Sequence, residues 1–128
     1  MSSKTVRDYM STKIHSIRAG ETAHVADSLM EKHGVRHLPV LDGGKLVGVI
    51  SDRDIKSAVA GGGDPRKLII ENICAPLPYV ATASTPLAAV AKEMAAQHIG
   101  STVIVDDDEK AVGIFTASDA LRALSELA

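Results

Sequence analysis

A motif that occurs twice in this chain sets the strongest limit on its fold. Gly48 is followed by two apolar residues, a hydroxyl side chain at Ser51 and a carboxylate at Asp54. The same pattern, G-x-x-[ST]-x-x-D, returns from Gly113 to Asp119, 65 residues later in a chain of 128. Because each copy follows an apolar run and precedes a helical pattern, we interpret the chain as two copies of one unit.

Each copy of the motif predicts a strand that passes directly into a helix. Residues 46–50 and 111–115 are almost wholly apolar, which is typical of strands covered on both faces. Glycine has no local use inside such a strand, so Gly48 predicts a close approach by another backbone or by a ligand. Ser51 is a favourable N-cap for the helix that follows it.

The expected elements occur in the same order in both halves. Each half reads as a short helix, an extended piece, a helix, a strand, a turn, a strand and a helix. Gly61–Gly63 is the one clear linker, and Asp64-Pro65 predicts the start of a new helix. We therefore divide the chain into a first repeat, residues 1–62, and a second repeat, residues 63–128. Neither half has enough residues to bury a core alone, so we expect the two to pack together.

Composition excludes several classes of function. The net charge is −2 and aromatic residues make up 2% of the chain, which argues against a nucleic-acid partner. No apolar run approaches the length of a membrane span, so we expect no membrane partner. Cys74 is the single cysteine, which suits a reducing cytoplasm, where we expect the protein to act. The five histidines lack the spacing of a metal site, and no nucleophile–base pair suggests an enzyme.

The two motifs, with the His37-Leu38-Pro39-Val40 stretch before the first, resemble a tandem pair of cystathionine-beta-synthase (CBS) domains, the Bateman module. The resemblance covers about residues 3–128. It implies an α/β (α+β) fold in which two β-α-β-β-α repeats pack sheet to sheet with pseudo-two-fold symmetry. It also implies a regulatory, signal-transducing module without catalysis or cofactor. Such a module binds AMP, ADP, ATP, S-adenosylmethionine or NAD in clefts between the repeats.

The resemblance also implies roles for individual residues. Asp54 and Asp119 would accept hydrogen bonds from the ribose hydroxyls, as a carboxylate can from a cis-diol. Ser51 and Thr116 would lie near the phosphates, at helix N-termini that favour anions. Arg36 and His37 resemble a phosphate-contacting basic pair. In the second repeat Ser101-Thr102-Val103 stands in place of this pair and the proline that follows it. The further candidates are residues beside the motifs and aliphatic side chains for the adenine: Arg53, Ser118, Ile14, Ile50 and Val80.

Two alternatives stay open at this stage. Ser51-x-x-Asp54 and Thr116-x-x-Asp119 are also capping-box patterns, which need no ligand. The whole module could likewise be a structural dimerisation or partner-binding unit without a functional ligand. We expect a homodimer in either case, because Val25, Leu29, Leu121 and Leu124 put more apolar helix surface outward than one pair of small units should expose. An effector protein would then receive the signal.

Overall fold

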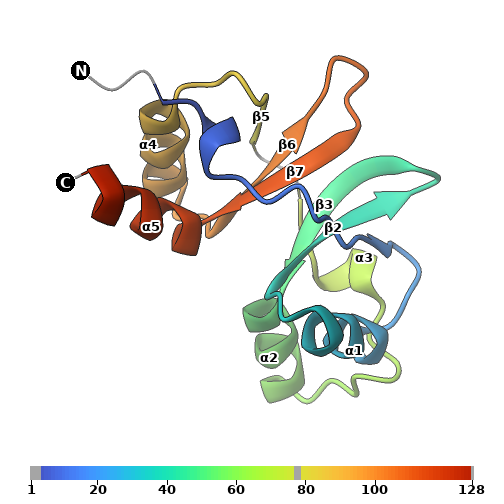
Figure 1. Cartoon of the computed structure of the whole chain (residues 1–128). Coiled ribbons are helices and arrows are strands. Elements are labelled where there is room, and N and C mark those ends of the chain that lie inside the picture. Colours follow the sequence, from blue (N-terminus) through green and yellow to red (C-terminus); the bar gives the residue numbers. More distant parts are fainter. Residues whose placement is uncertain (1–3, 77–78, 128) are drawn as a thin grey trace. The chain divides into compact units, whose positions relative to one another are not determined.

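The computed structural model describes residues 4–76 and 79–127, and they form a mixed α/β structure with two sheets. Its contacts divide the chain into two compact units (Figure 1). Unit 1 contains residues 1–14 and 79–128, and unit 2 contains residues 15–78. Each unit carries one copy of the repeated motif, so each is described separately below.

Unit 2 contains the first expected β-α-β-β-α series, followed by a short helix and a short strand. In chain order its elements are β1 (Ile17–Arg18), α1 (Ala23–His33), β2 (His37–Asp42), β3 (Lys45–Ser51), α2 (Asp52–Ala60), α3 (Ile70–Ile73) and β4 (Ala75–Pro76). The four strands form one sheet in the order β1-β2-β3-β4. β1 runs parallel to β2, and the other neighbours are antiparallel.

Unit 1 contains the second series, and a short 3-10 helix from the start of the chain joins it. Its elements are η1 (Val6–Asp8), β5 (Val80–Ala81), α4 (Leu87–Gln97), β6 (Ser101–Val105), β7 (Ala111–Thr116) and α5 (Ala117–Leu127). The sheet order is β5-β6-β7, with β5 parallel to β6 and β7 antiparallel to it. The β-α-β-β-α order expected from the sequence is therefore confirmed in both units.

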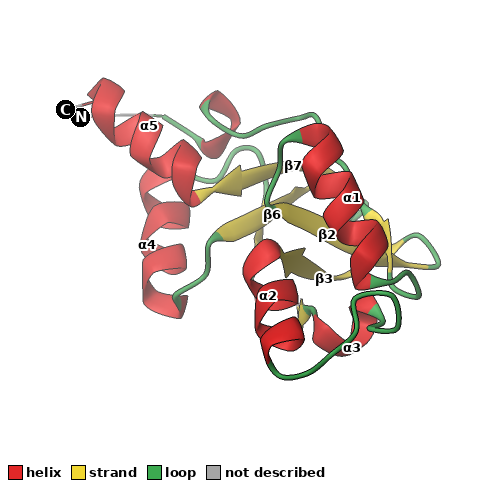
Figure 2. Ribbon diagram, turned by 90° about the horizontal axis from the view of Figure 1, so that it is seen from below, coloured by secondary structure: helices red, strands yellow, loops and turns green. Residues whose placement is uncertain are grey.

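Each unit builds its own core from the apolar face of its sheet and two helices (Figure 2). In unit 2, α1 and α2 cover Leu38, Val40 and Ile50, all of which are fully buried. In unit 1, α4 and α5 cover Ile104 and Phe115, which are fully buried as well. Burial of apolar surface is the main favourable term in folding, so these two clusters hold the two motifs in place.

The first residues of each repeat pack into the unit formed by the other repeat. Val6 of η1 is fully buried in the core of unit 1, and Ile70 of α3 is fully buried in the core of unit 2. Equivalent backbone bonds fix the two segments: Val6 N donates to Thr85 O at 2.9 Å, and Ile70 N donates to Glu21 O at 2.8 Å. The compact units therefore differ from the division at residue 62, because the repeats exchange their leading segments.

The prediction that a helix begins at Asp64-Pro65 is wrong. Residues 65–67 form turns, and the helix of this segment is α3, which begins at Ile70. Asp64 acts as a turn residue instead, since its side-chain Oδ1 accepts from Arg66 N at 3.0 Å. Asp at the start of a turn makes this local bond readily, which explains why the helix-cap pattern misleads here.

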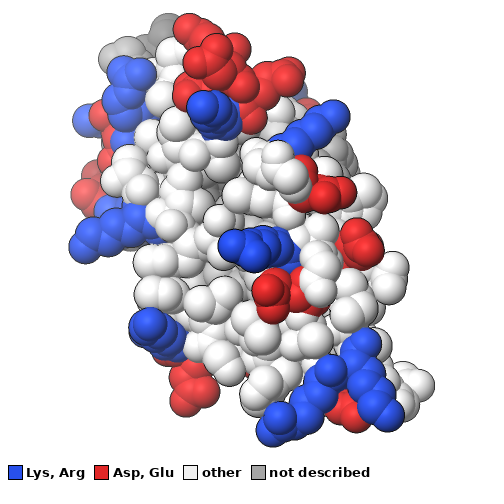
Figure 3. Space-filling model, turned by 90° about the vertical axis from the view of Figure 1, so that its right-hand side faces the viewer, with Lys and Arg blue, Asp and Glu red and all other residues white. Residues whose placement is uncertain are grey.

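The surface carries charges of both signs. On the face drawn in Figure 3, groups of lysine and arginine and groups of aspartate and glutamate are scattered among wide uncharged areas. In residues 4–76 and 79–127, no helix is long and apolar enough to cross a bilayer. The same residues contain no group of three or more His, Cys, Asp or Glu side chains placed to hold a metal ion.

Candidate ligand-binding site

The first motif forms a complete capping box at the start of α2. Ser51 is the N-cap in extended conformation, and its Oγ accepts from Asp54 N at 3.1 Å. The Asp54 carboxylate returns the interaction, because its Oδ2 accepts from Ser51 N at 2.9 Å. The capping interpretation of this motif is therefore confirmed, and a ligand role for Asp54 must coexist with it.

One of the two carboxylate oxygens of Asp54 takes no part in the helix cap. Oδ2 is used by Ser51, whereas Oδ1 makes no hydrogen bond or ion pair with the residues that the structure describes. The residue is half-buried, and its spare oxygen has no protein donor among the described residues. A carboxylate oxygen in this state is a ready acceptor for a hydroxyl donor.

Pairing of β2 with β3 brings the basic pair to the motif. His37 lies opposite Ser51 in the antiparallel register, so the two side chains belong to neighbouring strands at the start of α2. Arg36 is anchored by its backbone, since its carbonyl oxygen accepts from Asp52 N at 3.0 Å, and its side chain is exposed. Arg36, His37, Ser51 and Asp54 thus gather at one end of the sheet of unit 2.

The charge state of His37 follows from its surroundings. Burial lowers the pKa of His37 below its usual value of 6.5, and Arg36 lowers it further. Asp52 and Asp54 oppose this shift, because negative charges favour the imidazolium form. The net effect leaves His37 neutral near pH 7. A bound anion beside it would raise its pKa and favour the imidazolium form.

The segment of the second repeat that packs into unit 2 brings Cys74 close to Asp54, which the sequence did not predict. Partial burial raises the pKa of the Cys74 thiol, and the nearby Asp54 carboxylate also raises it. Cys74 Sγ lies 3.1 Å from the position that a β-carbon on Gly48 would occupy. Cys74 also packs against the core of unit 2, as a free cysteine commonly does. No sequence pattern links it to Asp54, since chain segments 20 residues apart meet through folding.

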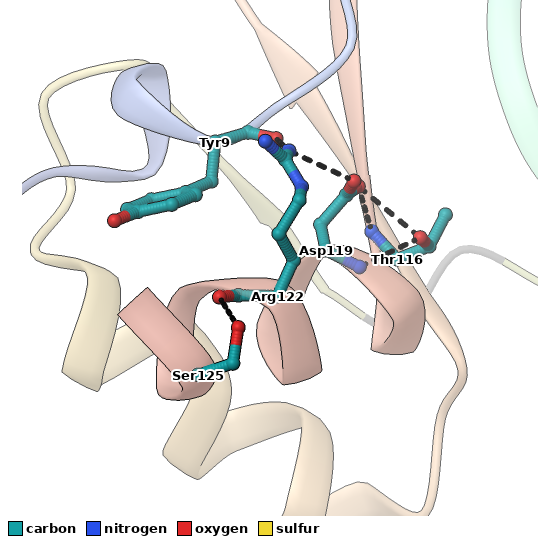
Figure 4. A network of polar contacts seen from close by, with 5 residues as sticks. All are labelled: Tyr9, Thr116, Asp119, Arg122 and Ser125. Carbon is teal, nitrogen blue, oxygen red and sulfur yellow. Dashed lines mark hydrogen bonds and ion pairs between the residues drawn. The ribbon is translucent and has the colours of Figure 1, made fainter. Parts of the chain in front are cut away.

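The second motif repeats the cap in unit 1 and adds an arginine (Figure 4). Asp119 Oδ2 accepts from Thr116 N at 2.9 Å and from Thr116 Oγ1 at 3.1 Å. Arg122 Nη2 lies 3.5 Å from Asp119 Oδ1 and donates to Tyr9 O at 3.0 Å. The Arg122 guanidinium also lies over the Tyr9 ring, 5.4 Å from its centroid. Oδ1 of Asp119 therefore faces the Arg122 guanidinium, whereas the equivalent Oδ1 of Asp54 has no partner among the described residues.

The register corrects which residues replace the basic pair. Ser101 pairs with Thr116 as His37 pairs with Ser51, and Ala117 N donates to Gly100 O as Asp52 N donates to Arg36 O. Gly100-Ser101 therefore stands in the place of Arg36-His37, one position earlier than the sequence comparison placed it. The second motif has no basic pair on its neighbouring strand, so the two sites differ in charge.

The remaining candidates are spread over both units. Ile50 is fully buried in the core of unit 2, so the prediction that it contacts a ligand is not retained. Arg53 and Ser118 are exposed at equivalent positions of α2 and α5. Ile14 is half-buried, and Val80 is 38% exposed, so both have surface available. Ile14 and Val80 belong to unit 1, whereas the basic pair belongs to unit 2.

Comparison with known proteins agrees with the fold and the motifs. The family model of the CBS domain matches residues 6–61 and 70–126. The crystal structure of the CBS domain pair of protein MJ0100, in complex with 5′-methylthioadenosine and S-adenosyl-L-methionine, superimposes with a TM-score of 0.90 at 30% identity. That match covers 99% of this chain and 100% of the other. The structure of CBSX2 in complex with AMP has a TM-score of 0.78 at 26% identity and covers 96% and 97% of the two chains.

These two repeats place the protein in a family: the chain belongs to the CBS domain family and carries a pair of CBS domains. Among curated relatives, the homoserine O-acetyltransferase of Methanococcoides burtonii is 31% identical over 121 residues, which is 94% of this chain and 24% of the relative. The chain thus spans about a quarter of the length of this relative. The match leaves most of the enzyme outside the comparison.

Proposed function

We propose that the protein is a non-catalytic regulatory module that binds an adenine nucleotide or a related adenosyl ligand and passes the binding event to an effector protein. Support comes from the CBS domain pairs of MJ0100 and CBSX2, which bind adenosyl compounds. At the two motifs, among the described residues, the Ser51 and Thr116 hydroxyls are hydrogen-bonded within their helix caps and not to a histidine, so the residues are suited to binding. A regulatory role follows from this chemistry better than a catalytic one.

The observation that carries the proposal is the spare Oδ1 atom of Asp54 beside Arg36 and His37. The ribose of an adenosyl ligand offers two hydroxyl donors, and a carboxylate oxygen can accept from them. A phosphate or carboxylate group of the ligand would be attracted by the Arg36 guanidinium and by the positive end of α2. Asp54 would then serve two purposes, with Oδ2 in the helix cap and Oδ1 on the ligand.

We assign the stronger nucleotide site to the motif of unit 2. Asp119 in the second motif already faces Arg122, and no basic pair precedes it in the strand β6. An uncharged adenosyl compound, such as 5′-methylthioadenosine, suits such a motif better than a nucleotide does. Arg53 and Ser118 would contact the ligand from the first turns of α2 and α5, and Ile14 and Val80 are the aliphatic candidates for the adenine.

A thermal-shift panel tests this proposal. AMP, ADP, ATP, S-adenosylmethionine, 5′-methylthioadenosine and NAD are each added to the purified protein at increasing concentration. A ligand at 100 times its Kd stabilises the folded state by about 2.7 kcal/mol, which raises the melting temperature measurably. If no adenosyl compound shifts the melting temperature at millimolar concentration, the ligand-binding function is excluded and the partner-binding alternative is favoured.

We also propose that the protein is a homodimer that acts in the cytoplasm. The structure alters the basis of this expectation, because Val25 and Leu29 are half-buried and pack against the core of unit 2. Leu121 and Leu124 are 68% and 63% exposed, so the apolar helix surface is concentrated on α5. Light scattering at micromolar concentration measures the mass, and a monomer would contradict the proposal.

A further inference from the structure

The second motif carries a side-chain contact that the first motif lacks. Arg122 Nη2 donates to Tyr9 O at 3.0 Å and lies 3.5 Å from Asp119 Oδ1, so one nitrogen joins both residues (Figure 4). The Arg122 guanidinium lies over the Tyr9 ring, and Tyr9 is buried in the core of unit 1. Asp119 Oδ1 corresponds to the spare Oδ1 of Asp54, which the proposed function assigns to the ribose. In unit 1 the protein itself therefore occupies this oxygen.

The equivalent positions of unit 2 hold residues that cannot make this contact. α2 and α5 both begin directly after the motif hydroxyl, so Ser57 corresponds to Arg122. η1 and α3 begin at the equivalent residues described above, which aligns Ile73 with Tyr9. Ser57 provides no positive charge and Ile73 provides no aromatic ring. The carboxylate of the first motif therefore keeps its spare oxygen.

From this difference we infer that Arg122 is a specificity-determining residue of the second motif, because it competes with the ribose hydroxyls of an adenosyl ligand for Asp119 Oδ1. The inference rests on the proposed ligand-binding function and adds a residue that limits it. A guanidinium N–H and a ribose O–H are both donors, so they need the same acceptor positions. An adenosyl ligand therefore places its diol on Asp119 only when Arg122 moves away.

A count of acceptor positions shows why the two groups exclude each other. A carboxylate offers about four lone-pair positions. Thr116 N and Thr116 Oγ1 use two of them on Asp119 Oδ2, and Arg122 uses one on Oδ1. About one position remains, whereas the two hydroxyls of a cis-diol need two. Asp54 accepts only from Ser51 N among the described residues, so about three positions remain in the first motif.

The Arg122–Asp119 contact is weak enough for a ligand to displace it. Its nitrogen–oxygen separation is 3.5 Å, and the Arg122 side chain is 54% exposed. Exposed ion pairs of this kind contribute about 2- to 5-fold to an equilibrium constant. The bond from Arg122 to Tyr9 O is shorter, at 3.0 Å, so a displaced guanidinium keeps its second anchor. The competition should thus lower ligand affinity without excluding the ligand.

A nuclear magnetic resonance titration tests the inference at both motifs in one sample. Adenosine is added to the isotope-labelled protein; the amide signals of Thr116 and Asp119 report the second motif, and those of Ser51 and Asp54 report the first. We expect Arg122→Ser, which introduces the residue of unit 2, to tighten adenosine at the second motif by about 2- to 5-fold. The Kd at the first motif should stay the same. 2′,3′-Dideoxyadenosine lacks the hydroxyls, so its Kd should not change at either motif.

Ser57→Arg is the matched control in unit 2. It places an arginine at the equivalent position of α2, where Ser57 is exposed. Asp54 would still keep about two acceptor positions, which are enough for the diol. We therefore expect the adenosine Kd at the first motif to change by less than about twofold. A loss as large as the gain expected for Arg122→Ser would show that arginine acts through its charge or bulk, and this would overturn the inference.

A second variant guards against a loss of folding. Arg122→Gln removes the charge but keeps a side chain that can pack over Tyr9 and donate to its carbonyl oxygen. An amide is a weaker donor to a carboxylate than a guanidinium, so this variant should also tighten adenosine at the second motif, by less than Arg122→Ser does. If Arg122→Ser is unfolded, an unchanged or weaker Kd in folded Arg122→Gln would overturn the inference.

The same titration separates the inference from the proposed function. If adenosine shifts no amide signal at either motif in the wild type and in Arg122→Ser, the ligand function is refuted and the inference fails with it. If adenosine binds, but its Kd at the second motif is the same or weaker in Arg122→Ser, the inference alone is refuted. An equal gain for 2′,3′-dideoxyadenosine would also refute the inference alone, since that gain would not depend on the hydroxyls.

Discussion

The carbonyl oxygen of Ala75 lies so close to Gly48 that a β-carbon on this residue would clash with it. Gly48 pairs with Pro76 and Val49 pairs with Ala75, so β4 of the exchanged segment runs along the open edge of β3. Unit 1 repeats this arrangement, because Ser11 O lies 3.1 Å from the β-carbon position of Gly113. The glycine of the repeated motif therefore makes room for a neighbouring backbone, which was one of the two roles that the sequence predicted.

Alanine substitution of Gly48 and of Gly113 should lower the stability of the protein by different amounts. Gly48→Ala places a methyl group on a backbone oxygen that is held in a sheet, so we expect a loss of about 1–3 kcal/mol in the free energy of unfolding. Gly113→Ala should cost less, because its nearest neighbour is Met10 Sδ at 3.0 Å, on a flexible side chain. Urea denaturation of both variants measures the difference. A larger loss for Gly113→Ala would contradict this order.

The two oxygens of Asp54 allow its two roles to be tested separately. Asp54→Asn keeps an amide oxygen that can accept from Ser51 N, and it replaces the spare oxygen by a donor. We predict a change in stability below about 0.5 kcal/mol and a loss of about 1.5–3 kcal/mol in nucleotide binding, or roughly 10- to 150-fold in Kd. Calorimetry and thermal melts measure the two quantities. Unchanged affinity would limit Asp54 to the helix cap.

A double-mutant cycle with a modified ligand identifies the hydroxyls. Asp54→Ala removes the cap and should cost about 0.5–1 kcal/mol of stability in addition to affinity. A 2′,3′-dideoxy nucleotide should bind the wild type more weakly than the parent nucleotide does, and it should lose little more on Asp54→Ala, because the partner is already absent. Asp119→Ala is the matched control. Additive losses at both positions would refute the ribose contact.

Arg36 should act on the phosphate rather than on the nucleoside. Its side chain is exposed at the start of the strand that carries His37, so its removal leaves the cores of both units untouched. We expect Arg36→Ala to weaken AMP by about 3- to 10-fold while adenosine binding stays the same, since exposed charge contacts contribute modestly. Isothermal titration with both ligands measures this, and equal losses would show that Arg36 acts on the fold or the base.

His37 should make stability and nucleotide affinity depend on pH. Because the folded pKa of His37 lies below 6.5, the unfolded state binds more protons between the two values. The contribution of His37 to stability is therefore present above pH 6.5 and declines as the pH falls through this window. His37→Gln should flatten the dependence in a series of melts from pH 5 to 8. His33, whose pKa is lowered by burial and by His15, provides the background that remains.

Nucleotide binding should raise the pKa of His37, which is opposite to the effect of burial. A phosphate near His37 favours the imidazolium form and raises its pKa, so AMP should bind more tightly as the pH falls from 7.5 towards 6. Adenosine lacks the phosphate and should show little change. The AMP dependence that remains in His37→Gln measures titration of the ligand itself. If the wild type and His37→Gln have the same profile, His37 does not sense the phosphate.

Local sequence determined the elements and the caps of this protein. Thr22 caps α1 through a 3.3 Å bond from Val25 N, and Gly34 ends the helix in the left-handed conformation, which are the positions that threonine and glycine favour. Both motifs form their capping bonds at the expected residues. These features depend on neighbours within four positions along the chain, so propensity and spacing are sufficient to predict them.

The tertiary structure decided what depends on distant segments. The sequence could not say that residues 6–11 join unit 1 and residues 70–76 join unit 2, because the two repeats offer similar cores and similar strand edges. Nor could it show that Leu29 is covered while Leu121 is exposed, since both lie on apolar helical stripes. Exposure depends on which elements pack together, and long-range packing determines that. The same packing brings Cys74 to Asp54 and Arg122 to Tyr9.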